Sequence, residues 1–115
     1  SDPRRPKLAG SVHIGGIVRR ASHPSGNAYA GGPQMVEISR DGKRVYWTNS
    51  LYSTWDNQFY PDGVPGAEVM ANVNPSGGLE LARDYWVSFA DGYRAHQIRL
   101  DGGDCSTDSF CYPSA

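Results

Sequence analysis

Three histidines and two cysteines are the side chains of this sequence best suited to metal or redox chemistry. The histidines are His13, His23 and His96, and the cysteines are Cys105 and Cys111. Neither set has a dedicated metal-binding spacing such as H-x-H, HExxH or paired CxxC motifs. An isolated histidine is more often a hydrogen-bonded structural or surface residue, so spacing alone assigns no ligand. His96 is the best placed, because it precedes the alternating segment "QIRL", at whose entrance a side chain could point into a channel.

The two cysteines lie close together in "GGDCSTDSFCYPSA". Their spacing allows a disulfide that pins the C-terminal tail, which would fit an oxidising compartment such as a periplasm. The alternative is two free thiols in a reducing cell. We favour the disulfide between Cys105 and Cys111, because two exposed thiols on a tail would be open to oxidation. The aspartates of this segment lie among glycine and serine, which is typical of structural turns.

A second candidate for chemistry is the stretch "TNSLYSTWDNQFYPDG", which places aromatic and amide side chains where a tight hairpin turn would be expected. Trp55 and Tyr60 could line a pocket for a small apolar ligand. Asn49, Asp56 and Gln58 could orient that ligand. The same rings could instead cap the ends of a sheet, because large aromatics on a long loop can bury their own surface over a core.

The composition favours short strands joined by turns. The chain has 115 residues with 14 Gly, 8 Pro and 11% aromatic residues, and Gly and Pro are disfavoured inside helices. A net charge of -1 gives no electrostatic reason to expect nucleic acid or an anionic membrane as partner. No segment approaches the roughly 18 consecutive apolar residues of a membrane span, and the first residues lack the apolar core of a signal peptide. We therefore expect a soluble all-β chain.

The order of the predicted elements divides the chain into four parts. Residues 1–10 are typical of a surface linker, which suggests a piece of something larger. Residues 11–30 combine one or two short strands in "SVHIGGIVRR" with a loop. Residues 31–90 carry a strand at "MVEIS", an Asp-Gly turn, a strand at "RVYWTNS" and a return strand at "AEVMANVN". "LELARDYWVSF" then supplies a fourth edge strand or a short helical turn, and residues 91–115 supply a closing strand and the tail.

A meander of three or four antiparallel strands is the repeating unit of a β-propeller blade, and it also fits a free-standing β-sandwich of similar length. No second clean copy of the unit is visible in the sequence. In a propeller, the chain would hold about one full blade plus parts of the neighbouring blades. Such a segment cannot close a ring by itself.

With these residues in view, the chain resembles the C-terminal part of the selenium-binding protein and methanethiol oxidase family. The match runs through "GGPQMVEISRDGKRVYWTNSLYSTWDNQFYPDG" and "AHQIRLDGGDCSTDSFCYP", with a looser echo in "SVHIGGIVRR". These blocks in this order make the resemblance highly specific. It implies an all-β, seven-bladed β-propeller several times longer than this chain, with residues 1–115 as a C-terminal segment.

The resemblance also implies an activity. Bacterial members look like copper-dependent oxidases that convert methanethiol, oxygen and water to formaldehyde, hydrogen sulfide and hydrogen peroxide. Their copper lies among histidines of different blades, and His96 is the histidine of this chain that falls in a matching block. The family therefore implies copper as cofactor, His96 as one metal ligand, the segment from Trp55 to Tyr60 at the channel mouth, and the rest of the propeller as partner. One histidine cannot hold a catalytic copper, so activity would require the missing N-terminal part.

The C-terminal block looks like the bacterial members. Animal members typically read Ala-His-Glu where this chain has Ala95, His96 and Gln97, and they end soon after the first cysteine. The second cysteine and the ending at Tyr112 and Pro113 look like bacterial forms, which are often exported. A periplasmic location is therefore expected, with the cytoplasm as the alternative. A second class of function stays open, namely a non-catalytic propeller segment that binds selenium, a thiol or a partner protein.

Overall fold

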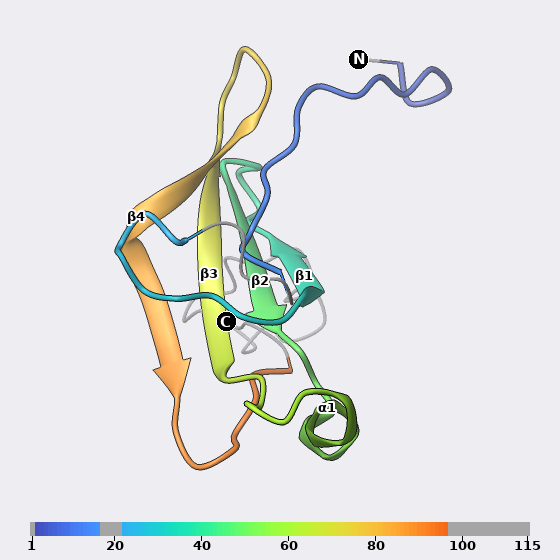
Figure 1. Ribbon diagram of the computed structural model, residues 1–115. Coiled ribbons are helices and arrows are strands. Elements are labelled where there is room, and N and C mark those ends of the chain that lie inside the picture. The colour runs from blue at the N-terminus through green and yellow to red at the C-terminus, as the bar shows by residue number, and fades with distance from the viewer. Residues whose placement is uncertain (1, 17–21, 97–115) are drawn as a thin grey trace, which may run out of the picture.

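The structure is a computed structural model that describes residues 2–16 and 22–96 (Figure 1). In these ranges the chain forms the strands β1 (Pro33–Ile38), β2 (Arg44–Asn49), β3 (Gly66–Val73) and β4 (Leu79–Phe89), and the helix α1 (Ser53–Phe59). The strands make one antiparallel sheet in the order β1-β2-β3-β4. The described part is thus mostly β-strand, as predicted, and its sheet is a simple meander.

Local turn chemistry explains the hairpin between β1 and β2. Gly42 has a φ of 69°, and its amide donates to the Ser39 carbonyl at 2.8 Å. The Asp41 carboxylate accepts the Ser39 hydroxyl at 2.6 Å and the Lys43 amide at 2.9 Å. The hydrogen bonds from Ser39 and Lys43 also hold the pKa of Asp41 below its usual range. The Asp-Gly pair therefore sets this turn, as the sequence predicts.

The segment "LELARDYWVSF" forms the strand β4, the first of the two structures that its sequence allowed. It follows a turn in which the Asn74 amide donates to the Gly78 carbonyl at 3.0 Å. The pairing of β3 with β4 shifts register between Val69 and Ala71, which marks a β-bulge or a related irregularity. β4 therefore lies beside β3 as an edge strand of the sheet.

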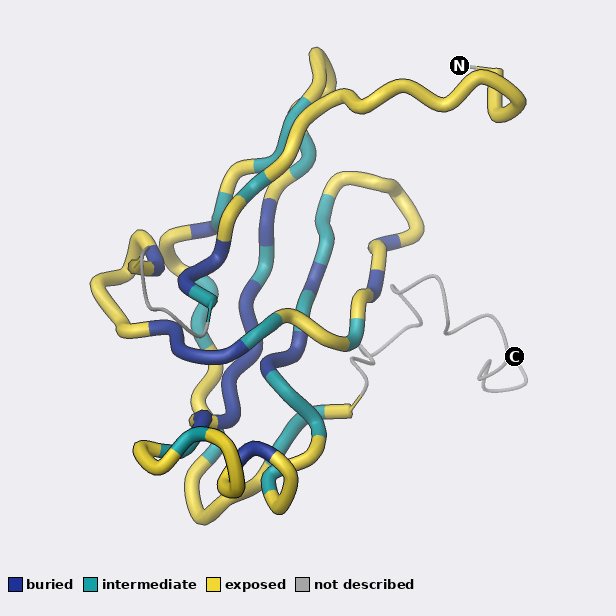
Figure 2. Tube along the Cα trace, turned by 45° about the vertical axis from the view of Figure 1, so that its right-hand side comes forward, coloured by how far each residue is buried: buried dark blue, intermediate teal, exposed yellow. Residues whose placement is uncertain are grey.

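One face of the sheet carries the main core, and the buried positions concentrate on the central strands (dark blue in Figure 2). Alternate residues of β3 point to this face. The segment 11–16 and the loop 22–32 before β1 cover them through Ile14 and Tyr29. The buried cluster comprises Ile14, Tyr29, Ala67 and Val69, with Trp47, Leu81 and Trp86 packed against it. On the opposite face Tyr46 packs against Tyr85, whose hydroxyl donates to the Glu68 carboxylate.

Two predicted elements differ from the structure. Residues 11–16 of the predicted first strand form no strand, because Gly15 and Gly16 adopt positive φ values of 33° and 73° and Ile14 packs into the core. The aromatic stretch, predicted as a loop, contains α1. It has neither Gly nor Pro between Ser50 and Tyr60, so a turn of helix can form there, and Pro61 favours its end. The predicted closing strand "QIRL", Cys105 and Cys111 lie outside the described residues.

The end of the predicted linker contacts the sheet. Residues 2–11 are exposed, yet a Cβ atom added at Gly10 would lie 2.5 Å from the Cα atom of Gly78, in the turn between β3 and β4. The two backbones therefore pack closely because neither position carries a side chain. No helix in the described ranges is long and apolar enough to cross a membrane.

Three connections leave the sheet at the same end. The pairs Pro33 with Asn49 and Gly66 with Phe89 show that β1 and β3 begin where β2 and β4 end. The end of the loop 22–32, the segment 50–65 with α1, and the segment 90–96 therefore meet there; α1 and the segment 90–96 lie in the lower part of Figure 1. We call this the loop end of the sheet, and it positions every candidate site residue described below apart from His13 and His23.

Candidate functional site

A hollow of about 280 Å³ at the loop end brings together three of the four residues predicted to line a substrate channel. Trp55, Asp56 and Tyr60 line it, and Gln58 does not. Its other walls come from the start of β1, the glycines before it and two positions flanking α1, namely Gly31, Gly32, Pro33, Gln34, Ser50 and Val64. We call it the aromatic hollow.

The aromatic wall of this hollow lies at the surface of the chain. Trp55 is 64% exposed, and its ring centroid lies 5.6 Å from that of Phe59, which is 59% exposed and does not line the hollow. They are four residues apart on α1, a spacing that places two side chains on the same face of a helix. The Trp55 ring therefore does not cap the sheet within the described residues. The ring forms an exposed wall of the aromatic hollow.

A buried carboxylate supplies the polar side of the aromatic hollow. Asp56 is buried, and its Oδ2 atom accepts a hydrogen bond from the Ser50 hydroxyl. Ser50 has a φ of 39°, a left-handed conformation that is uncommon for a residue other than glycine. Its amide donates to the Gly32 carbonyl at 3.1 Å. These two bonds hold the strained residue in place and fix the entry of the chain into α1.

Asn49, which the sequence suggested as a ligand-orienting residue, braces two of the three connections. Its side chain is fully buried, and Nδ2 donates to the carbonyls of Ala30 and Pro65, both at 2.7 Å. A Cβ atom added at Gly31 would lie 2.5 Å from Asn49 Oδ1, so the loop approaches this closely only because it has glycine there. Asn49 thus ties the loop 22–32 to the segment 50–65.

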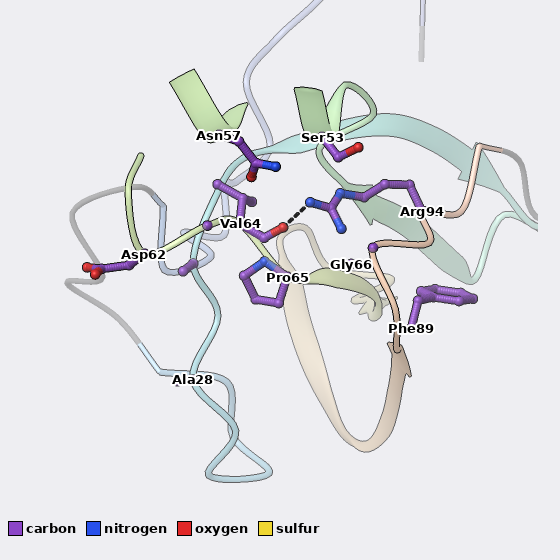
Figure 3. Close-up of a pocket in the computed structure, with 12 residues that line it drawn as sticks. Ala28, Ser53, Asn57, Asp62, Val64, Pro65, Gly66, Phe89 and Arg94 are labelled. Carbon is purple, nitrogen blue, oxygen red and sulfur yellow. Dashed lines mark hydrogen bonds between the residues drawn. The ribbon is translucent and has the colours of Figure 1, made fainter. Parts of the chain in front are cut away.

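A second hollow, of about 510 Å³, adjoins the first and takes lining residues from all three connections (Figure 3). Val64 lines both hollows. In the second, Arg94 donates from Nη2 to the Val64 carbonyl and from Nη1 to the Tyr93 carbonyl at 3.2 Å. A Cβ atom at Gly66 would lie 2.2 Å from the Tyr93 carbonyl oxygen, so glycine lets the segment 90–96 pack onto β3. We call it the Arg94 hollow.

His96, the predicted metal ligand, lies two positions beyond Arg94 and is exposed. Across residues 2–16 and 22–96, no three His, Cys, Asp or Glu side chains come close enough together to hold a metal ion. The described residues therefore do not form a copper site by themselves. A single exposed imidazole fits copper only as one ligand of a site that other parts of a longer polypeptide complete.

The other two histidines lie elsewhere. His13 is exposed and lines a hollow with Ile14 and Trp47 on the covered face of the sheet. His23 is only 2% exposed, and its ring centroid lies 5.1 Å from that of Trp86. Its Nδ1 atom lies 2.8 Å from the Ser25 hydroxyl and accepts a hydrogen bond from the Ser25 amide at 3.2 Å, whereas Nε2 has no hydrogen-bond partner among the described residues. His23 is therefore a packed core residue, and burial lowers its pKa.

Acidification should destabilise the fold through His23. Because the folded-state pKa of His23 lies below its ordinary value of 6.5, the unfolded chain takes up a proton as the pH falls through that range and the folded chain does not. The stability that neutral, buried His23 contributes above its ordinary pKa is therefore lost as the pH falls through that value and toward the lower pKa of the folded chain. Denaturant unfolding at about pH 7.5 and about pH 5.5 measures this loss, which should shrink in His23→Gln and persist in the exposed control His13→Gln. An unchanged pH dependence in His23→Gln would refute the assignment.

Sequence reasoning missed several residues of the loop end. Gly66 and Arg94 lie outside the quoted motifs, and Ser53 and Asn57 lie within the aromatic stretch but received no individual role; the four meet only through the register of the sheet. The available signal was indirect. Because neighbouring strands of a meander run in opposite directions, the predicted strand order already indicated which connections would meet at one end of the sheet.

Comparisons with known proteins relate this chain to selenium-binding proteins. The model of the 56 kDa selenium-binding protein family matches residues 1–111. The chain is 41% identical to a methanethiol oxidase from Homo sapiens over 94% of its length, and 38% identical to selenium-binding protein 3 from Arabidopsis thaliana over 93%. A solved structure, a hypothetical selenium-binding protein from Sulfolobus tokodaii, is 60% identical and superposes with a TM-score of 0.80 over 98% of this chain.

The chain belongs to the selenium-binding protein family, as the sequence predicted. It spans 28% and 27% of the length of the two curated relatives and 25% of the solved chain. The relatives that carry the name methanethiol oxidase support an oxidoreductase family.

Proposed function

We propose that this chain is the C-terminal segment of a copper-dependent methanethiol oxidase. The reaction converts methanethiol, oxygen and water to formaldehyde, hydrogen sulfide and hydrogen peroxide. The observation that carries the proposal is that the aromatic hollow and the segment 90–96, which contains His96, lie at the same end of the sheet. A site for a small thiol needs aromatic walls and few fixed polar groups, and this hollow has the aromatic side chains of Trp55 and Tyr60 and the fixed carboxylate of Asp56.

The four-stranded sheet would be one blade of a seven-bladed propeller, and the remainder of a longer polypeptide would supply the other blades. Two observations support this. The chain covers only about a quarter of its relatives' length. In addition, the edge strand β1 leaves Val36 and Ile38 51% and 46% exposed, and such apolar side chains suit a neighbouring blade. The proposed partner is therefore the rest of the propeller.

Each residue of this chain has a defined role in the proposal. When bound, copper would supply one-electron chemistry with oxygen, with His96 as one of its ligands. Trp55 and Tyr60 would exclude water around the thiol, and the Ser50 hydroxyl would hold Asp56 in position to orient it. Gln58, which does not line the hollow, would act from the rim.

Replacing Trp55 with alanine should raise the KM for methanethiol by roughly three- to tenfold, because about 1 kcal/mol of apolar contact is lost. Copper content should stay unchanged. The melting temperature should also change little, since the ring is mostly exposed in this chain. Tyr93→Ala is the matched control, because Tyr93 is an exposed aromatic residue that lines neither hollow. A large loss of stability with an unaltered KM would show that the ring is structural.

The proposed function is tested on the intact polypeptide that contains this chain. Stoichiometric copper in the purified protein, together with peroxide and formaldehyde formed only when methanethiol is present, is the expected result. An intact protein that is free of copper after copper supplementation and inert toward methanethiol would overturn it. Cell fractionation tests the proposed periplasmic location, and the alternative there is the cytoplasm.

A non-catalytic function is the second candidate, and the name of the Arabidopsis thaliana relative, selenium-binding protein 3, is the observation that favours it. In that case the aromatic hollow would hold a soft ligand such as a selenium compound or a thiol without turnover. Saturable binding of methanethiol without peroxide formation in the copper-loaded protein would identify this function.

A further inference from the structure

The Arg94 guanidinium is a positive charge without a negative partner in the described part of the chain. Its two hydrogen bonds go to backbone carbonyls, of Val64 and Tyr93, and Nε is buried without an acceptor. Within residues 2–16 and 22–96 no carboxylate forms an ion pair with it. A half-buried charge in this state is costly, because charged groups removed from water are normally paired.

Two more polar side chains face the same hollow with free hydrogen-bonding groups. Ser53 and Asn57 project from successive turns of α1 and line the hollow together with Arg94 (Figure 3). Neither side chain hydrogen bonds to any group in the described part of the chain. A guanidinium, a hydroxyl and a carboxamide together present the donors that a carboxylate group accepts, and a guanidinium matches the planar geometry of that group.

The remaining walls of this hollow are apolar and small. They come from Ala28, Ala30, Val64, Pro65 and Phe89. The one acidic residue that lines it, Asp62, is exposed and lies on the far side from Arg94 in Figure 3. Its negative charge disfavours a second anionic group on the ligand, and the apolar walls favour a short hydrocarbon chain.

We propose that the Arg94 hollow binds a small monocarboxylate with a short apolar chain. The carboxylate accepts hydrogen bonds from Arg94, Ser53 and Asn57, and the hydrocarbon chain packs against Phe89 and Pro65. This site requires neither copper nor thiol oxidation, so it stands apart from the proposed function. Since Arg94 also holds the segment 90–96, an occupied hollow would steady the chain next to His96.

The test uses isothermal titration of the intact polypeptide with sodium butyrate at constant ionic strength, with butyramide as the neutral isostere. Saturable binding of butyrate and none of butyramide is expected. In Arg94→Gln the dissociation constant should rise about tenfold or more, because a charge-assisted hydrogen bond is lost. Arg94→Lys should lose less, and Arg83→Gln, at an exposed position of β4 outside the hollow, should bind like the wild type.

Three outcomes would overturn the proposal. The first is the absence of saturable butyrate binding to the wild-type protein, a measurement that requires no variant to fold. The second is equal binding of butyrate and butyramide, and the third is equal binding of butyrate to Arg94→Gln and to the wild type, which would leave Arg94 as a structural link between two loops. The circular dichroism spectrum of each variant establishes that it is folded before titration.

Discussion

His96→Ala in the intact polypeptide is expected to lose its bound copper and to reduce methanethiol-dependent peroxide formation by more than about 100-fold. Removal of groups that merely support a metal ligand typically costs 10- to 100-fold, and removal of a ligand should cost at least as much. The melting temperature of the copper-free protein should stay unchanged, because the His96 side chain is exposed in this chain. Metal analysis, peroxide formation and thermal unfolding of one preparation give the three values.

His13→Ala is the matched control for this prediction. His13 is also exposed, but it lines a hollow on the face of the sheet and none at the loop end. The control should retain both copper and activity. Full copper occupancy in His96→Ala would remove His96 from the proposed site, whereas loss of copper from His13→Ala alone would move that site to the other face of the sheet.

The parts of the fold that the sequence predicted are those set by local chemistry. The Asp41-Gly42 turn and the alternating strands around it determine the first hairpin with no help from the rest of the chain. The short turns between β1 and β2 and between β3 and β4 indicated two hairpins, whereas β2 and β3 are joined by the long segment 50–65 with α1. By contrast, the segment around Ile14 has strand-forming residues and still forms no strand in its described part, because packing over the sheet outweighed local propensity.

The candidate site was predictable only in part for the same reason. Trp55 and Asp56 lie on one short helix and Tyr60 follows its last residue, so a local motif could group them. Arg94 reaches Val64 across thirty positions, and that contact depends on where two strands end. The burial of Asn49 likewise depends on how closely two loops approach it, which the type of residue does not reveal.

Asn49→Leu should lower the free energy of unfolding by about 2–4 kcal/mol, although it keeps the size of the side chain nearly unchanged. Asn49 Nδ2 is the donor for the carbonyls of Ala30 and Pro65, and a leucine leaves both without it. A buried acceptor that loses its partner costs about 1–3 kcal/mol, and the Pro65 carbonyl should lie near the lower limit because that residue is exposed.

The same substitution should also affect the site, because Asn49 ties together two of the connections that build both hollows. We therefore expect the loss of stability to be accompanied by a higher KM for methanethiol in the fraction that remains folded. Asn72→Leu is the control. It lies at an exposed position of β3 and should change stability by no more than about 0.5 kcal/mol. Denaturant unfolding of both variants measures the change in stability. Equal stability of Asn49→Leu and the wild type would show that the two loops stay together without the Asn49 hydrogen bonds.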